Sequence, residues 1–336
     1  MVTTDIAVIG AGSYGTCLAM LFGNAGHRVS LHTRKPEHAH ELETTRINQG
    51  YLPAYRLPDT VFVTSDLTAA VRGKKFVVGV TPSHAVRETF GGLAEAIHPD
   101  AVVINASKGL EDGTLNTIDA VYRDVLPERI ANRATFLSGP TFAIEIAAGM
   151  PAAIVLAGRD VETCSIAQQT LSSIRFRIYT TDDVLGVLVG GAIKNVMAIA
   201  AGLSDGLGLG SNARAALITR GLAEITRIGV AMGAQTQTFA GLSGIGDLVL
   251  TCSGDASRNR RVGLGLGQGK AMSDILTEMK QIAEGVKTTK VAHELAQKLG
   301  VDAPITAVMH AIIHEGAPAR HAMAALMSRA LKAERD

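Results

Sequence analysis

Three closely spaced glycines follow an apolar run near the start of the chain, in the stretch VIGAGSYGTCLAM (8–20). The preceding run, DIAVI, is typical of a buried strand, and the apolar residues after the glycines recur at helical spacing. A second apolar run, RVSLH, completes a strand-helix-strand unit of about 30 residues. In such a unit Gly10 allows the turn, Gly12 admits a pyrophosphate to the backbone, and Gly15 lets helix and strand pack closely. A structural turn is the alternative, but this context favours dinucleotide binding.

The residues after the second strand indicate which dinucleotide binds. NAD sites usually carry an acidic side chain here, about 20 residues beyond the glycines, to hold the ribose 2′-hydroxyl. This chain has HTRKPEH instead, with Arg34 and Lys35 directly after the strand. Two cations suit a 2′-phosphate, so the predicted cofactor is NADPH in preference to NADH. The alternative interpretation is a basic surface turn.

The rest of the first half repeats the pattern of strand and helix. Five apolar, β-branched runs are separated by helical lengths: KFVVGV, DAVVINA, RATFLS, AAIVLA and FRIYTT. This alternation predicts an α/β fold, a Rossmann-type doubly wound sheet that is mostly parallel with helices on both faces. Loops after the strands line the ligand crevice in such sheets, which places Pro82, Lys108, Gly139 and Thr141 near the cofactor.

Length and composition limit the other possibilities. A chain of 336 residues exceeds one typical core, and strand signals largely end near Asp182. We therefore expect a dinucleotide-binding domain at 1–182 and a mainly helical substrate domain at 183–336. The formal net charge of +1 gives no global field to attract nucleic acid or an anionic membrane.

Cysteine usage and the amino terminus favour the cytoplasm. The three cysteines, Cys17, Cys164 and Cys252, form no CxxC pair, so disulfides and thiolate metal sites are not expected. The first ten residues lack the basic flank and cleavage pattern of a signal peptide. The most apolar stretch, 187–201, is shorter than the roughly 20 residues that cross a bilayer. We expect a soluble cytoplasmic protein that is not integral to a membrane.

The segment 186–202 carries the leading candidate for acid and base chemistry. Its only strongly polar side chains are Lys194 and Asn195, on a helix that is apolar on nearly every face and so belongs in a core. Burial of an ammonium lowers its pKa toward the range where it exchanges protons at neutral pH. The alternative is a lysine that reaches the surface or pairs with a structural acid.

A second unusual stretch is GLSGIGDLVLTCSGDASRNRRVG (241–263). Its glycines and small residues suggest an adaptable loop. Arg258 can hold phosphate oxygens in a bidentate manner, with Asn259 as a neutral donor, and Asp247 can orient Lys194 or a substrate hydroxyl. Nucleic acid is less consistent, because no aromatic platform or broad basic surface accompanies these cations. Arg260 and Arg261 alternatively begin a solvated helix.

Other constellations give weaker signals. His310 and His314 are four residues apart, as in one helical face of a zinc site, but no third ligand is evident and no metal is predicted. Schiff-base chemistry at Lys108 or Lys194 would leave the glycine motif unexplained. Cys252 is interpreted as a packing residue.

Taken together, these motifs resemble those of the bacterial type of NAD(P)-dependent glycerol-3-phosphate dehydrogenase, which reduces dihydroxyacetone phosphate. The matching stretches run almost from end to end: GAGSYGT, NQGYLPAYRLPD, SKGLE, SGPTFAIEIAAG, GGAIKNVMAIAAGLSDGLGLGSNARAALITRGL, GLSGIGDLVLTCSGDASRNRRVG and IAEGVKTTK. The serine of ASKG, where relatives often have threonine, and Ile282, where many have valine, are mild departures.

The residue patterns above and the resemblance together imply the residues of the site. Cofactor contacts are expected at Gly10, Gly12, Ser13, Tyr14, Gly15, Arg34, Lys35, Pro82, Lys108, Ala143, Arg258, Ile282 and Glu284. Substrate contacts are expected at Lys108, Gly139, Thr141, Asn195, Asp247, Thr251, Ser257, Arg258 and Asn259. Lys194 matches the proton acceptor of the family, and Lys108 and Asp247 complete the expected catalytic set. A homodimer and a product that feeds glycerophospholipid synthesis are also implied.

Two other functions remain open at this stage. One is a two-domain dehydrogenase that acts on a β-hydroxy acid or a sugar acid phosphate with the same lysine and asparagine. The other is a noncatalytic sensor that reports NADPH through the nucleotide fold, although a sensor has no need of a buried lysine.

Overall fold

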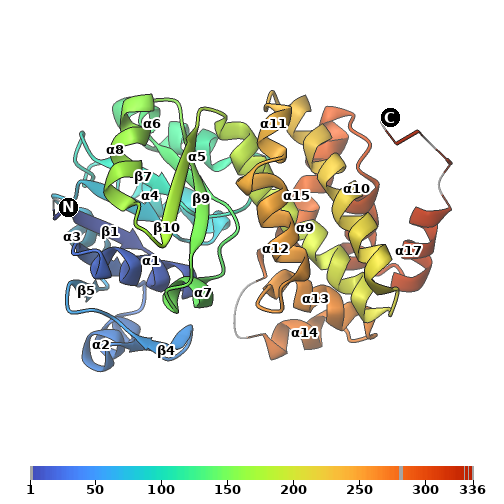
Figure 1. Cartoon of the computed structure of the whole chain (residues 1–336), viewed down its shortest axis with the longest axis horizontal. Coiled ribbons are helices and arrows are strands. Elements are labelled where there is room, and N and C mark those ends of the chain that lie inside the picture. Colours follow the sequence, from blue (N-terminus) through green and yellow to red (C-terminus); the bar gives the residue numbers. More distant parts are fainter. Residues whose placement is uncertain (1–2, 280–282, 329, 332, 335–336) are drawn as a thin grey trace.

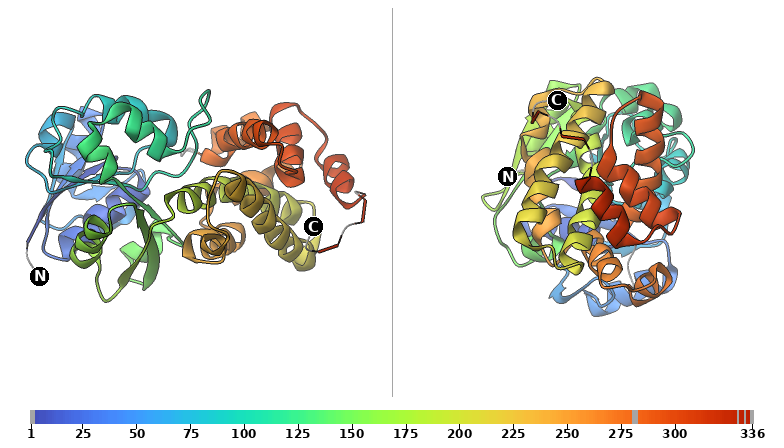
Figure 2. Two further views of the ribbon diagram at one scale, coloured as in Figure 1. Left: turned by 90° about the horizontal axis from the view of Figure 1, so that it is seen from above. Right: turned by 90° about the vertical axis from the view of Figure 1, so that its right-hand side faces the viewer.

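Two units lie side by side in the computed structural model, a blue-to-green unit with a sheet and a yellow-to-red unit of helices (Figures 1 and 2). The structure describes residues 3–279, 283–328, 330–331 and 333–334. The predicted fold class, a Rossmann-type sheet followed by a mainly helical domain, is confirmed.

The first unit is built on one eight-stranded sheet in the order β10-β9-β8-β7-β6-β1-β2-β5. Its strands are β1 (Asp5–Ile9), β2 (Arg28–His32), β5 (Val61–Thr64), β6 (Phe76–Gly79), β7 (Val102–Asn105), β8 (Thr135–Ser138), β9 (Ala152–Gly158) and β10 (Phe176–Thr181). Neighbouring strands are parallel except β8 and β9, which are antiparallel. A separate hairpin pairs β3 (Ile47–Asn48) with β4 (Leu52–Arg56).

Helices cover both faces of this sheet, because its strands are apolar on both sides. In β1, Ile6 and Val8 enter one core, while Ala7 and Ile9 enter the other. The helices are α1 (Ser13–Asn24), α2 (Pro36–Thr45), α3 (Leu67–Val71), η1 (Ser83–Ala85), α4 (Val86–Gly91), α5 (Ile118–Val125), α6 (Glu128–Asn132), α7 (Ala143–Ala147) and α8 (Val161–Leu171).

The glycine motif occupies the turn between β1 and α1. Gly10 has φ +114°, and a Cβ there would lie 2.7 Å from the carbonyl oxygen of Val80. A Cβ on Gly15 would overlap the carbonyl oxygen of Gly10, whereas a Cβ on Gly12 would meet nothing within 4 Å. The first and third glycines are therefore required by backbone packing, and the second leaves open space at the start of α1.

All regular secondary structure among the described residues of the second unit is helical. It comprises α9 (Val184–Gly206), α10 (Gly210–Ala231), α11 (Thr236–Phe239), the π-helical turn η2 (Leu242–Gly246), α12 (Asp247–Ser253), α13 (Arg258–Gly267), α14 (Met272–Glu278), α15 (Glu284–Leu299), α16 (Pro304–His314) and α17 (Ala319–Met327). The adaptable loop predicted for 241–263 is wrong, because most of this stretch is helical. Its glycines serve close helix packing instead.

The helix α9 is the centre of this unit. It is longer than the apolar stretch recognised in the sequence, and by length and composition alone it could cross a membrane. However, 94% of its most apolar window is buried inside the protein, as in a core helix. Asp183 caps its amino terminus by accepting a hydrogen bond from the backbone N–H of Gly186 at 3.0 Å.

The helices α9 and α13 meet backbone to backbone. Gly202 and Gly206 of α9 face Gly263 and Gly267 of α13. A Cβ on Gly202 would overlap the carbonyl oxygen of Arg260, and a Cβ on Gly263 would overlap the carbonyl oxygen of Ile199. Glycine on both sides thus permits a crossing that a Cβ at either position would obstruct.

A methyl group at this crossing should separate the two helices. We expect Gly263→Ala to lower the free energy of unfolding by about 1–3 kcal/mol, the usual cost of overpacking. Gly91→Ala in α4 is the matched control, since a Cβ there would lie 3.8 Å from its nearest neighbour. Thermal unfolding of both variants tests the difference, and equal melting temperatures would contradict it.

Candidate active site

Lys194 of α9 lies at the junction of the two units because the preceding turn of the helix carries two glycines, which have no side chains. Gly190 packs against the backbone of Ser243 in η2, and Gly191 packs against Ser138 at the end of β8. A Cβ at Gly191 would lie 2.7 Å from the Ser138 Oγ. Close packing on both sides brings the next turn, with Lys194, beside residues of both units.

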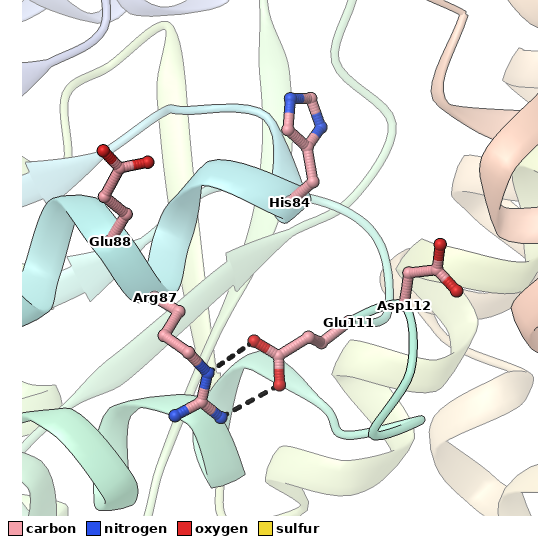
Figure 3. A pocket seen from close by; sticks show the side chains of 5 residues that line it. All are labelled: His84, Arg87, Glu88, Glu111 and Asp112. Atoms are coloured by element: carbon pink, nitrogen blue, oxygen red, sulfur yellow. Dashed lines mark hydrogen bonds and ion pairs between the residues drawn. The ribbon is translucent and has the colours of Figure 1, made fainter.

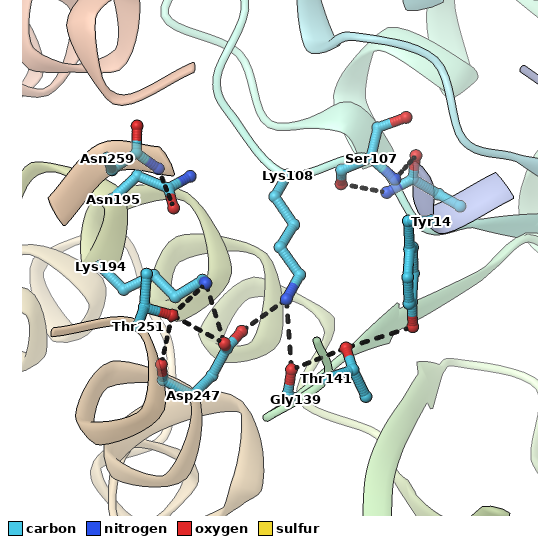
Figure 4. A network of polar contacts seen from close by, with 11 residues as sticks. Tyr14, Ser107, Lys108, Gly139, Thr141, Lys194, Asn195, Asp247, Thr251 and Asn259 are labelled. Carbon is cyan, nitrogen blue, oxygen red and sulfur yellow. Dashed lines mark hydrogen bonds and ion pairs between the residues drawn. The ribbon is translucent and has the colours of Figure 1, made fainter. Parts of the chain in front are cut away.

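One buried carboxylate lies between two ammonium groups (Figure 4). Asp247, the first residue of α12, approaches Lys194 Nζ with Oδ1 at 2.8 Å. Its Oδ2 accepts a hydrogen bond from Lys108 Nζ at 2.6 Å. Lys108 comes from the loop after β7, so this ion triad joins the sheet unit to the helical unit.

The hydroxyl of Thr251 completes the environment of the α9 lysine. Thr251 Oγ accepts a hydrogen bond from Lys194 Nζ at 2.7 Å and donates to the carbonyl oxygen of Asp247 at 2.6 Å. An ammonium has three donors. Asp247 and Thr251 engage two of them, which leaves one N–H of Lys194 for a bound molecule.

Burial and charge act against each other in this triad. Burial lowers the pKa of Lys194 to about 8, although the carboxylate of Asp247 opposes that shift. Burial would raise the pKa of Asp247, but Lys108 and Lys194 outweigh it and hold that pKa below its ordinary value. Asp247 is therefore an anion at neutral pH, and Lys194 can gain or lose a proton near neutrality.

The sheet side of the site continues from Lys108 to the glycine motif. Lys108 Nζ also donates to the carbonyl oxygen of Gly139 at 3.2 Å. Thr141 Oγ donates to Tyr14 in α1 at 3.3 Å, and burial raises the pKa of that phenol. The preceding residue of the motif, Ser13, donates a hydrogen bond from its hydroxyl to the carbonyl oxygen of Tyr51.

Two asparagines connect three helices on the other side of the lysine. Asn259 Nδ2 donates to Asn195 Oδ1 at 2.9 Å, and Asn259 Oδ1 accepts from the backbone N–H of Gly285 at 2.9 Å. Helix α13 is thereby tied to α9 and to the first turn of α15.

The amino terminus of α13 presents cations and backbone donors to the same region. Ser257 is its N-cap and accepts a hydrogen bond from the backbone N–H of Arg260 at 3.2 Å. Arg258 is accessible to solvent, but the surrounding protein partly desolvates it and lowers its pKa, while Glu284 acts in the opposite direction. Burial raises the pKa of Glu284 to about 7. A helix start with a nearby arginine is suited to bind an anion.

The structure brings most of the predicted site residues into this region. Arg34 and Lys35, shortly after the end of β2, are exposed. Pro82 precedes η1, and Ala143 begins α7. Ser257 is occupied as a cap rather than aimed outward, and Ile282 lies outside the described residues.

Two neighbours of the site were not recognised in the sequence. Asp205 binds Arg260 and so corrects the interpretation of Arg260 as part of a solvated helix, although Arg261 is exposed. The sequence did offer one signal for Asp205: it lies about three helical turns after Lys194, and so on the same face of the same helix. Tyr51 contributes to the electrostatic environment of Arg258, but no local pattern predicts that long-range approach.

The described residues also contain a cavity lined by charged side chains. A cavity of about 480 Å³ is lined by His84, Arg87, Glu88, Glu111 and Asp112, and Arg87 there is held by Glu111 (Figure 3). Among the described residues, no group of three or more histidines, cysteines or carboxylates is arranged to hold a metal ion. Burial raises the pKa of the Cys252 thiol to about 12, which fits a packing role.

Comparison with known proteins decides the family. The model for the amino-terminal part of NAD-dependent glycerol-3-phosphate dehydrogenase matches residues 5–164, and the model for its carboxy-terminal part matches residues 183–324. The chain belongs to this family. It is 51% identical to the glycerol-3-phosphate dehydrogenase [NAD(P)+] of Geobacter sulfurreducens, with 98% of each chain covered.

A solved glycerol-3-phosphate dehydrogenase has the same architecture. The crystal structure from Coxiella burnetii is 38% identical, covers 97% of this chain and 99% of its own, and superposes with a TM-score of 0.93. The glycerol-3-phosphate dehydrogenase [NAD(P)+] of Moorella thermoacetica is 47% identical over 97% of this chain and 96% of its own. The resemblance found in the sequence is thus confirmed at the level of the family.

Proposed function

We propose that this chain reduces dihydroxyacetone phosphate to sn-glycerol 3-phosphate with NAD(P)H, reversibly, and that Lys194 exchanges the proton. The observation that carries the proposal is the triad of Lys108, Asp247 and Lys194, placed where loops after the sheet strands meet the core helix. Membership of the glycerol-3-phosphate dehydrogenase family supports the substrate and the reaction.

The start of α1 fits a dinucleotide. The open space over Gly12 lets a pyrophosphate approach the backbone. The first N–H groups of an α-helix lack partners within the helix and can bind the phosphate oxygens. Ser13, Tyr14, Pro82, Ala143 and Glu284 are proposed to contact the cofactor. The bound nicotinamide cofactor supplies the hydride.

Lys194 is suited to donate a proton to the oxygen of the reduced carbonyl. Its pKa of about 8 makes proton release near neutrality inexpensive, and Asp247 and Thr251 leave one N–H directed away from them. In the direction of oxidation the neutral amine accepts the proton. Lys108 adds positive charge beside the developing alkoxide, and Asp247 holds both lysines in place.

The start of α13 is proposed to hold the phosphate of the substrate. Arg258 supplies a guanidinium for phosphate oxygens, and the helix terminus supplies backbone donors. Asn259, which donates to Asn195 beside Lys194, is proposed to contact the substrate together with Asn195. The same role is proposed for Gly139, Thr141, Thr251 and Ser257. Binding of a remote phosphate orients the carbonyl toward the lysine.

The domain boundaries, the location and the assembly of the enzyme are also part of the proposal. We propose residues 1–182 as the dinucleotide-binding domain and 183–336 as the substrate domain. A cytoplasmic homodimer whose product feeds glycerophospholipid synthesis is part of the same proposal, supported by resemblance to the bacterial enzymes.

Replacement of the lysine tests the proton step. We expect Lys194→Ala to lower the rate of NADPH oxidation with dihydroxyacetone phosphate by about 100-fold or more, as for loss of a general acid. Cofactor binding, followed by NADPH fluorescence, should persist. Lys270→Ala, at a partly exposed lysine paired with Glu278, is the control and should keep native turnover. Absence of turnover in the native protein would return the sensor and the other dehydrogenases to consideration.

Replacement of the two cations after β2 tests cofactor choice. Arg34→Ala combined with Lys35→Ala should raise the KM for NADPH by about tenfold or more, because a charged hydrogen bond contributes about 1.5–3 kcal/mol. The KM for NADH should stay near its native value. Arg72→Ala, at another exposed arginine of the same unit, is the control. An equal change for both cofactors would contradict recognition of a 2′-phosphate.

A further inference from the structure

The first turn of α13 carries more positive charge than one phosphate needs. Arg258, Arg260 and Arg261 lie within four residues at a helix amino terminus, where the helix dipole disfavours cations. Arg261 extends into solvent, and Arg258 borders the proposed phosphate site. The side chain of Arg260 differs from those of Arg258 and Arg261, because it is directed toward α9.

Asp205 at the end of α9 binds that third arginine. Its Oδ2 accepts from Arg260 Nη2 at 2.7 Å and from Arg260 Nε at 3.0 Å. The same oxygen accepts from Arg214 of α10 at 3.1 Å. The side chains of Asp205 and Arg260 are only 13% and 12% exposed, so water screens this pair weakly. Three helices therefore converge on one largely buried carboxylate.

The pair fixes one end of the segment that faces the substrate. The backbone N–H of Arg260 is bound by the Ser257 hydroxyl, and its guanidinium is bound by Asp205. Arg258 and Asn259 lie between these two anchors. Next to this pair, Gly202 of α9 packs against the carbonyl oxygen of Arg260, and no side chain separates the two helices there. A rotation of α13 would have to break the ion pair.

Asp205 and Lys194 lie on the same face of the core helix α9. Lys194 and Asp205 are separated by about three turns of α9, so their side chains leave nearly the same side of the helix. The ion pair thus fixes the position of the proposed phosphate-binding turn relative to α9, the helix that carries Lys194.

We propose that Asp205 is a positioning residue for substrate recognition: through Arg260 it sets the orientation of Arg258 and Asn259 relative to Lys194. The inference rests on the proposed function for the identity of the substrate. It assigns to Asp205 no contact with substrate or cofactor. Its effect is therefore expected in substrate affinity, while the proton step at Lys194 proceeds as before.

A matched pair of carboxylates tests this role. Asp255 binds the same arginine through Nη1 at 2.8 Å, but its side chain is 97% exposed. We expect Asp205→Asn to raise the KM for dihydroxyacetone phosphate about tenfold, with kcat within about threefold of native and an unchanged KM for NADPH. Asp255→Asn should leave all three constants near their native values. Equal substrate KM values for the two variants, or a loss confined to thermal stability, would overturn the proposal.

A double-variant cycle separates positioning from charge alone. Because Asp205 and Arg260 act as a unit, Asp205→Asn, Arg260→Gln and the combination should raise the substrate KM by the same factor. Additive changes would contradict the proposal. If Asp205→Asn does not fold, the combination, which leaves neither member of the pair charged, serves for the comparison with Asp255→Asn.

Direct binding keeps this test independent of turnover. Calorimetric titration of the native enzyme and Asp205→Asn with glycerol 3-phosphate should show a Kd about tenfold higher in the variant. If the native protein binds this ligand but does not reduce dihydroxyacetone phosphate, the proposed reaction fails while the titration still decides the role of Asp205. Equal affinity in the two proteins would overturn that role.

Discussion

A buried carboxylate between two ammonium groups is the interaction on which the site depends. Asp247 is 2% exposed, and burial of an unpaired anion at that depth would be unfavourable. Lys108 and Lys194 compensate its charge from opposite sides, one from each unit of the protein. Burial lowers the pKa of Lys194, the charge of Lys108 lowers it further, and Asp247 only partly opposes that shift. The conflict between burial and pairing thus produces a lysine that can exchange protons near neutral pH.

Close backbone packing makes this arrangement possible. Glycines at 190 and 191 bring α9 against η2 and β8, and glycines at 202 and 206 bring it against α13. One helix therefore positions Lys194, its carboxylate partner Asp247 and the turn that is proposed to bind phosphate. Because these contacts involve backbone atoms, they leave little freedom for the helices to shift relative to one another.

Much of the fold and several site residues could be predicted from the sequence. The glycine motif, the alternating apolar runs and a lysine in an apolar helix are local patterns with a direct physical meaning. The match of whole motifs to a known family added further predicted site residues, such as Glu284, which no local pattern indicates. The roles of these residues remain predictions, whereas their positions are now described.

The remaining features depend on contacts between distant parts of the chain. Glycines in 241–263 suggested a loop, because local propensity does not reveal that a helix lacks side chains in order to pack against another helix. The antiparallel pairing of β8 with β9 was also invisible, since an apolar run does not state its direction. The sequence did not distinguish Asp205 from an ordinary surface carboxylate, because its partner Arg260 lies far away in the chain, on α13.

The pKa of Lys194 is the measurement that tests the account most directly. Lysine side chains labelled with 13C at Cε report their own titration by NMR, and the Lys194→Ala variant assigns the resonance. The structure predicts a midpoint at about 8 for Lys194. A midpoint near the ordinary lysine value of about 10.4 would contradict the claim that burial, opposed by Asp247, prepares this amine for proton exchange.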